Sequence, residues 1–284
     1  MTLKIACVQS DIIARDPSAN FKHLDEIFNK IQDDRDIIVL PETFTTGFPA
    51  EPELFAEDEN GPTMTWLRKK ANERNCVICG SFITSFSQQT SSTSLIQNYH
   101  NTFVWMNPDG SYHTYDKRHT FSMGGEKELL NGNNLITIEY KGWRIRPFVC
   151  YDLRFPVWSR NRGDYDMILY VASWPTPRVS AWSALLVARA IENQCYVAGV
   201  NRVGTDPACE YCGGSVIIDP YGKTMAACAM NEECEASAEV DMEKLNAFRE
   251  KFPVLNDADM YSKLEEKNIC IYRTVLGIKN RRNY

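Results

Sequence analysis

The feature that most constrains the fold of this chain is an alternation of short apolar runs with segments of helical periodicity. Residues 3–9 (LKIACVQ) and 36–42 (DIIVLPE) are largely apolar runs of strand length. Between them, four apolar side chains recur at steps of three and four residues: Phe21, Leu24, Phe28 and Ile31. This spacing predicts a helix with one buried face, and therefore a strand–helix–strand unit.

The same alternation returns further along the chain. Helices are predicted at 61–75 and 180–194, and further strands at 76–84, 166–174 and 195–202. Residues 95–150 instead predict strands joined by the turns NPDG and KGW, whereas the polar residues 85–94 predict a loop. Residues 236–252 predict a last strand and a helix. Strand–helix–strand units early and late favour an α/β fold of two similar layers packed together in one domain.

Composition narrows the classes of function. The 284 residues carry a formal net charge of -6 and are 44% hydrophobic, so the chain can bury a large core. Nucleic acids and anionic membranes bind basic faces, so neither is an expected partner and a small molecule is favoured. The N-terminus lacks a signal-peptide pattern, and no stretch approaches the ~20 apolar residues of a membrane span. We therefore expect a cytoplasmic protein.

The ten cysteines of such a chain are expected to be reduced thiols. Two C-x-x-C pairs, Cys76/Cys79 and Cys209/Cys212, raise the question of zinc. The first pair falls in a predicted strand, where positions three apart face opposite sides. No His or Cys at finger-like spacing completes a tetrahedral set around the second pair. We therefore expect no metal site.

Three reactive side chains lie where predicted strands end: Glu42, Lys117 and Cys150. Open α/β sheets gather their ligands at the carboxyl ends of strands, so these side chains are expected to converge. A thiol needs a base or a nearby cation to supply thiolate, a carboxylate is such a base, and an ammonium stabilises an oxyanion.

Taken singly, each of these residues also has a plain structural interpretation. Glu42 could be a surface carboxylate, Lys117 a solvated lysine and Cys150 a core thiol. His119 offers a papain-like Cys–His pair as a further alternative, although a histidine in a basic turn is usually solvated. The joint occurrence of acid, base and thiol favours catalysis over a catalytically silent binding module.

The segments LPETFTTGF, YDKRHTF and VCYDLRFP resemble the Glu, Lys and Cys motifs of the nitrilase, or carbon-nitrogen hydrolase, superfamily. Further segments resemble its omega-amidase branch: ARAIENQCYVAGVNRVG, GGSVIIDPYGK and REKFPVLNDAD. The resemblance implies a four-layer α-β-β-α sandwich that forms a homodimer. It also implies that Glu42 is the general base, Lys117 the cation at the oxyanion and Cys150 the nucleophile. Glu126 then corresponds to a second glutamate that orients Lys117 or the hydrolytic water.

The expected substrate is a short dicarboxylic acid monoamide, such as 2-oxoglutaramate or succinamate. Arg154 is expected to bind the substrate carboxylate, and the structural alternative is an ion pair with Asp152. Trp174 and Arg178 are expected to line the same pocket, and the backbone N–H of Tyr151 to help hold the oxyanion. No cofactor is expected, because thiolate, carboxylate and ammonium together supply the chemistry.

Other members of the superfamily remain alternatives: an N-carbamoyl amino acid amidohydrolase, a deaminated-glutathione amidase and a nitrilase would share the Glu–Lys–Cys set. The catalytic domain is expected to span residues 1–255. Residues 256–284 are expected to form a C-terminal arm, which packs on the domain or on a partner subunit.

Overall fold

The computed structural model describes residues 1–48, 51–89 and 95–258. Its strands form two six-stranded sheets and one two-stranded ribbon. From residue 259 on, the predicted C-terminal arm lies outside the described residues. No helix in the described ranges is long and apolar enough to cross a membrane.

The first sheet has the strand order β14-β1-β2-β3-β4-β5. Its strands are β1 (Thr2–Gln9), β2 (Ile37–Val39), β3 (Val77–Gln89), β4 (Leu95–Met106), β5 (Tyr112–Asp116) and β14 (Cys234–Asp241). β1, β2 and β3 are parallel, and antiparallel strands flank them on both sides. The helices α1 (Pro17–Phe28) and α3 (Pro62–Arg74) connect the parallel strands, as a parallel pair requires a crossover.

The second sheet has the order β13-β12-β9-β8-β7-β6 and repeats this plan. Its strands are β6 (Ile138–Tyr140), β7 (Trp143–Val149), β8 (Met167–Ala172), β9 (Tyr196–Asn201), β12 (Val216–Ile218) and β13 (Thr224–Ala227). β7, β8 and β9 are parallel, and α5 (Val179–Asn193) connects β8 to β9. The remaining elements are α2 (Pro52–Phe55), α4 (Pro156–Ser159), α6 (Met242–Lys251), β10 (Val203–Thr205), β11 (Glu210–Cys212) and the 3-10 turns η1 (Cys150–Arg154), η2 (Thr176–Arg178) and η3 (Val254–Asp257).

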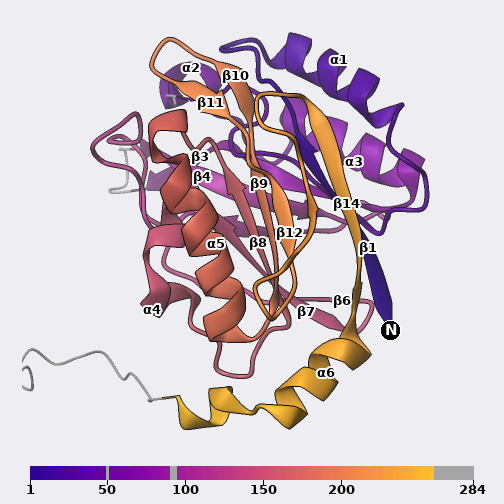
Figure 1. Ribbon diagram of the computed structural model, residues 1–284. Helices are drawn as coiled ribbons and strands as arrows, with labels where there is room; N and C mark the ends of the chain where they lie inside the picture. The colour runs from indigo at the N-terminus through magenta and orange to yellow at the C-terminus, as the bar shows by residue number, and fades with distance from the viewer. Residues whose placement is uncertain (49–50, 90–94, 259–284) are drawn as a thin grey trace, which may run out of the picture.

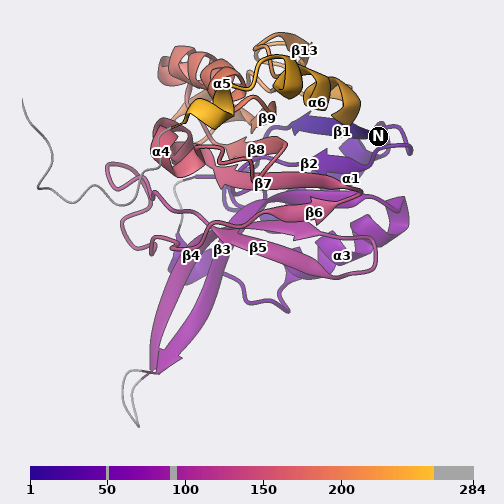
Figure 2. The ribbon, with the colours of Figure 1, turned by 90° about the horizontal axis from the view of Figure 1, so that it is seen from below.

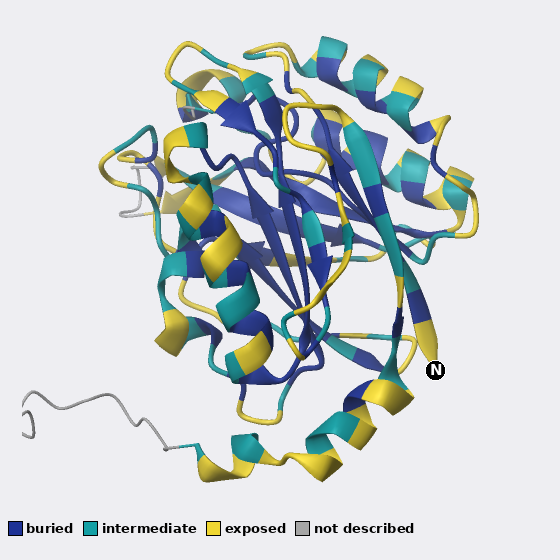
Figure 3. Ribbon diagram, in the orientation of Figure 1, coloured by how far each residue is buried: buried dark blue, intermediate teal, exposed yellow. Residues whose placement is uncertain are grey.

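The two sheets pack face to face between layers of helices (Figures 1 and 2). The largest buried cluster joins side chains of both sheets, such as Trp105 of β4 and Phe148 of β7. A second cluster fills the space between the first sheet and the helices α1 and α3. The central strands of both sheets, such as β2, β8 and β9, are buried along their whole length, whereas the helices expose one face (Figure 3). The expected four-layer α-β-β-α sandwich is confirmed.

Local signals in the sequence explain where the helices begin and end. Asp16 caps α1 because its Oδ1 accepts a hydrogen bond from the backbone N–H of Ala19 at 2.9 Å, and Pro17 follows at the first helical position. α3 ends at Asn75, which adopts the left-handed conformation with φ of 49°. Ile31 lies beyond the end of α1, but it is buried as its spacing predicted.

Three details differ from the sequence predictions. Residues 85–89, predicted as loop, continue β3 and pair with β4 as far as Leu95, in a hairpin that projects beyond the sheet (Figure 2). Its outer residues are mostly polar, and the apolar Phe86 and Ile96 among them are exposed. Residues 134–137 are not strand, and the β10–β11 hairpin was not predicted. The expectation for Cys76 and Cys79 holds, because they pack on opposite sides of the first sheet.

Candidate active site

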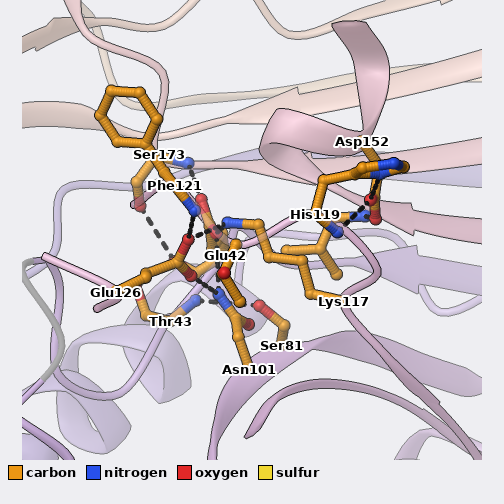
Figure 4. A network of polar contacts seen from close by, with 12 residues as sticks. Glu42, Thr43, Ser81, Asn101, Lys117, His119, Phe121, Glu126, Asp152 and Ser173 are labelled. Carbon is orange, nitrogen blue, oxygen red and sulfur yellow. Dashed lines mark hydrogen bonds and ion pairs between the residues drawn. The ribbon is translucent and has the colours of Figure 1, made fainter. Parts of the chain in front are cut away.

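Four of the predicted site residues meet between the two sheets. Glu42 follows β2, Lys117 follows β5 and Cys150 follows β7, while Glu126 comes from the loop between β5 and β6. Glu42, Lys117 and Glu126 are each 1% exposed. Figure 4 shows the Lys117 side chain reaching toward both carboxylates.

The Lys117 ammonium bridges the two glutamates. Its Nζ donates to Oε1 of Glu42 at 2.8 Å and to Oε2 of Glu126 at 2.7 Å. Burial by itself would lower the pKa of Lys117, but the charges of Glu126 and Glu42 raise it above its usual value. The lysine is therefore a fixed cation. Contacts with the described residues occupy two of its three N–H groups, which leaves one for a substrate oxygen.

Each glutamate accepts three hydrogen bonds. The backbone N–H of Ser173 donates to Oε2 of Glu42 at 2.8 Å, and that of Phe121 donates to Oε2 of Glu126 at 2.7 Å. The third donor is shared, because Nδ2 of Asn101 lies 2.8 Å from Oε1 of both glutamates. The sequence reasoning missed Asn101. The only signal in the sequence was a polar residue just before the apolar run TFVWM. A polar residue is also common where an ordinary strand begins, so this signal does not identify a site residue.

Cys150 occupies a sharp turn between β7 and η1. Its φ of 45° lies in the left-handed region, which is unusual for a residue with a side chain and typical of functional turns. Asp152 holds the turn, because its Oδ2 accepts from the backbone N–H of Val149 at 3.1 Å and from the hydroxyl of Tyr115 at 2.8 Å.

The surroundings of Cys150 disfavour its thiolate form. Burial raises its pKa well above the usual value, and the charge of Glu42 and a hydrogen bond to Glu42 add to this effect, while Lys117 opposes it. A thiol hydrogen-bonded to a carboxylate can pass its proton directly to that carboxylate as it attacks. The site therefore does not need a preformed thiolate.

A cavity of about 820 Å³ opens onto these groups. Glu42, Lys117 and Cys150 line it, and so do all four residues predicted to bind substrate: Tyr151, Arg154, Trp174 and Arg178. Glu126 lies behind Lys117, outside the lining. The volume is in the range of pockets that hold small molecules.

Two guanidinium groups lie in the cavity wall beside aromatic rings. The Cζ of Arg154 is 4.8 Å from the centroid of the Trp174 ring, and that of Arg178 is 5.4 Å from the centroid of the Phe121 ring. Within residues 1–48, 51–89 and 95–258, neither guanidinium forms an ion pair with a carboxylate. Both remain available to an anionic ligand.

Two alternatives are wrong: the ion pair between Arg154 and Asp152, and the papain-like Cys–His pair with His119. The carboxylate of Asp152 accepts from Val149, Tyr115 and His119 instead of pairing with Arg154. Nδ1 of His119 forms a hydrogen bond with Oδ1 of Asp152 at 2.8 Å, and the His119 ring stacks on the Phe155 ring with 3.7 Å between their centroids. His119 is not among the described residues that line the cavity. A Cys–His pair is therefore not formed.

Comparison with known proteins agrees with the motifs. Residues 4–250 match the carbon-nitrogen hydrolase family. Omega-amidase YafV of Escherichia coli (strain K12) is 46% identical over 263 residues, which cover 91% of this chain and 98% of that protein. The 2-oxoglutaramate amidase of Bacillus subtilis (strain 168) is 33% identical over 268 residues, covering 92% of this chain and 100% of that protein.

A solved structure shares the fold. XC1258 of Xanthomonas campestris, a CN-hydrolase superfamily protein with an arsenic adduct in its active site, superposes with a TM-score of 0.84 at 38% identity. The match covers 92% of this chain and 99% of that one. The family resemblance of the three motifs is confirmed, and the chain belongs to the carbon-nitrogen hydrolase family.

Proposed function

We propose that the protein is an omega-amidase, which hydrolyses the terminal amide of a short dicarboxylic acid monoamide such as 2-oxoglutaramate or succinamate. The observation that carries this proposal is a cavity with a Cys150–Glu42–Lys117 cluster on its wall and two guanidinium groups that have no carboxylate partner among the described residues. The cluster suits amide cleavage, and the guanidinium groups suit a substrate with a free carboxylate. The names of the relatives, omega-amidase and 2-oxoglutaramate amidase, support the same substrate class.

In the first half-reaction, the sulfur of Cys150 attacks the amide carbonyl carbon while Glu42 takes the thiol proton. The carbonyl oxygen becomes an oxyanion, which receives the remaining N–H of Lys117 and the backbone N–H of Tyr151. Glu42 then returns the proton to the amide nitrogen, and the C–N bond breaks. Ammonia leaves, and the acyl group stays on Cys150 as a thioester.

In the second half-reaction, Glu42 takes a proton from a water molecule that attacks the thioester carbonyl. The C–S bond breaks, the sulfur recovers the proton, and the acid is released. Glu42 therefore acts as base and acid in both halves. Glu126 does not reach the cavity, so its role in this scheme is to hold Lys117 in place.

A screen of ammonia release from purified protein tests the substrate class. Omega-amides, N-carbamoyl amino acids, deaminated glutathione and nitriles are compared at equal concentration. We expect the omega-amides to give the highest kcat/KM. A higher value for any other class would replace the proposal with the corresponding member of the superfamily.

A Glu42→Gln variant tests the base. The amide cannot accept a proton, so ammonia release is expected to fall by at least ~100-fold, and alkylation of Cys150 by iodoacetamide to slow. Glu57→Gln is a control, because Glu57 is a partly buried carboxylate that caps α3 by accepting from the N–H of Thr63 at 2.7 Å. Unchanged alkylation and turnover in Glu42→Gln would assign the base to another residue.

We also propose that the chain forms a homodimer in the cytoplasm, that residues 1–255 are the catalytic domain, and that residues 256–284 pack on the domain or on the partner subunit. The family resemblance supports the homodimer and the extent of the catalytic domain, whereas the cytoplasmic location and the C-terminal arm rest on the sequence alone. Light scattering on the full chain and on a chain ending at residue 258 measures the mass directly. A monomeric full chain would contradict the dimer.

A further inference from the structure

Asn101 contacts all three charged groups of the cluster. Its side chain is 0% exposed on β4, and its Nδ2 donates to Glu42 and to Glu126 at 2.8 Å each. Its backbone carbonyl accepts from the backbone N–H of Lys117 at 2.9 Å. Figure 4 shows the Asn101 amide next to the carboxylates of Glu42 and Glu126. No other residue in the described ranges joins these three.

The two carboxylates need a hydrogen-bond donor between them in addition to Lys117. Two carboxylates and one ammonium leave one buried negative charge, and Lys117 already donates to both carboxylates. Buried like charges favour protonation of one carboxylate unless hydrogen bonds stabilise the charged forms. The amide supplies two N–H donors without adding a charge. Both N–H groups donate to the glutamates, and Oδ1 of Asn101 has no hydrogen-bond partner among the described residues. Within that part of the chain, the side chain therefore forms hydrogen bonds to the two glutamates only.

We infer that Asn101 is a positioning residue of the reaction, whose amide donates to Glu42 and holds its carboxylate oriented so that it can accept the proton of Cys150. If Glu42 were already protonated, it could not take the thiol proton, and attack on the amide would stop. The inference rests on the proposed function for its turnover test. Alkylation of Cys150 does not need an amide substrate and tests the inference separately.

Two variants separate donor chemistry from shape. Asn101→Asp keeps the shape but brings an acidic oxygen to two carboxylate oxygens, so that at most one donor remains. Asn101→Ser is smaller, keeps a single O–H donor and adds no group that titrates near neutral pH. Asn98→Asp is the matched control, since Asn98 lies on the same strand and donates to Gln88 on the exposed part of the hairpin.

We expect Asn101→Asp to lower kcat by about 100-fold while KM stays within about threefold, because proton transfer is affected and binding is not. Alkylation of Cys150 should slow to a similar extent. In Asn101→Ser, the acid limb of the kcat/KM profile should move to higher pH, because Glu42 then binds a proton more readily. The groups that face Glu42 are Lys117, Cys150 and, across Asn101, Glu126. Asn98→Asp should match the wild type in all three measurements.

Several results would overturn the inference. One is kcat within about threefold of wild type, with unchanged alkylation, in Asn101→Asp, and another is an unshifted acid limb in Asn101→Ser. Another is a loss of activity accompanied by a lower melting temperature, with unchanged alkylation and pH profile, which would indicate a purely structural role. If the wild type released no ammonia from any amide, the proposed function would fail, while slowed alkylation in the variants would still support the role of Asn101.

Discussion

Replacement of Arg154 by Met should distinguish anionic from neutral amides. The guanidinium lies in the cavity wall over Trp174, and Asp152, the nearest carboxylate in sequence, takes its hydrogen bonds from other groups. We therefore expect Arg154 to pair with a substrate carboxylate. Methionine keeps an apolar chain of similar length against the Trp174 ring, so the change removes the charge and little of the packing.

The size of the effect follows from the environment of Arg154. Two opposite charges ~4 Å apart attract by ~4 kcal/mol at an effective dielectric constant of ~20. Truncating one partner of a hydrogen-bonded charge pair costs about 2–5 kcal/mol. Arg154 is only half-buried, and Arg178 lines the same cavity and can bind part of the substrate charge. We therefore expect a cost in the lower part of this range, about 2–3 kcal/mol. This corresponds to a roughly 30- to 160-fold lower kcat/KM for succinamate.

The assay compares ammonia release from succinamate and from butyramide, which has the same length and no carboxylate. The neutral amide never contacts the guanidinium charge, so its kcat/KM should stay within about threefold. Arg68→Met is the control, since the Arg68 guanidinium lies 5.6 Å from the Tyr112 ring centroid but outside the cavity lining. Equal losses on both substrates would refute the reasoning and leave Arg178 as the candidate for the carboxylate.

Three further outcomes are expected. Cys150→Ala should abolish ammonia release with an unchanged melting temperature, and near-wild-type turnover would contradict the thioester. Exhaustive dialysis against EDTA should leave activity intact, whereas a loss restored by zinc would show a metal requirement. Burial alone would raise the pKa of Asp166, but Arg144 and Arg249 hold it below its usual 3.8. Asp166→Asn should therefore lower the free energy of unfolding by about 3 kcal/mol at neutral pH. Because the folded-state pKa is depressed, this difference should shrink as the pH falls below 3.8, and a constant difference in thermal denaturation would argue against it.

Patterns that burial imposes on the sequence could be predicted. The segment 167–172 is apolar throughout because β8 lies in the middle of a sheet with both faces covered. The ends of predicted strands indicated the positions of Glu42, Lys117 and Cys150. Glu126 was predicted only from the resemblance to the family, because the neighbouring residues in the sequence do not distinguish it from Glu128.

Features that depend on distant contacts could not be predicted. Asn101 becomes part of the cluster only because β4 brings it against residues from two other segments, and an isolated Asn in a strand has no such signature. The extension of β3 through residues 85–89 was missed because a two-stranded ribbon exposed on both sides has no hydrophobic alternation. The environment of Arg154 could not be predicted either, because it has no carboxylate partner among the described residues only as long as Asp152 is directed toward other groups.

The pairing of β14 with β1 bears on how the protein is made. β1 is among the first segments to leave the ribosome, yet its outer neighbour, from Cys234 to Asp241, is among the last of the described strands to be synthesised. Until then, β1 presents an unpaired edge whose side chains, such as Ile5 and Val8, are fully buried in the finished protein. Incomplete chains released before β14 is synthesised therefore expose an apolar, aggregation-prone strand edge, and we expect chaperones and proteases to bind them.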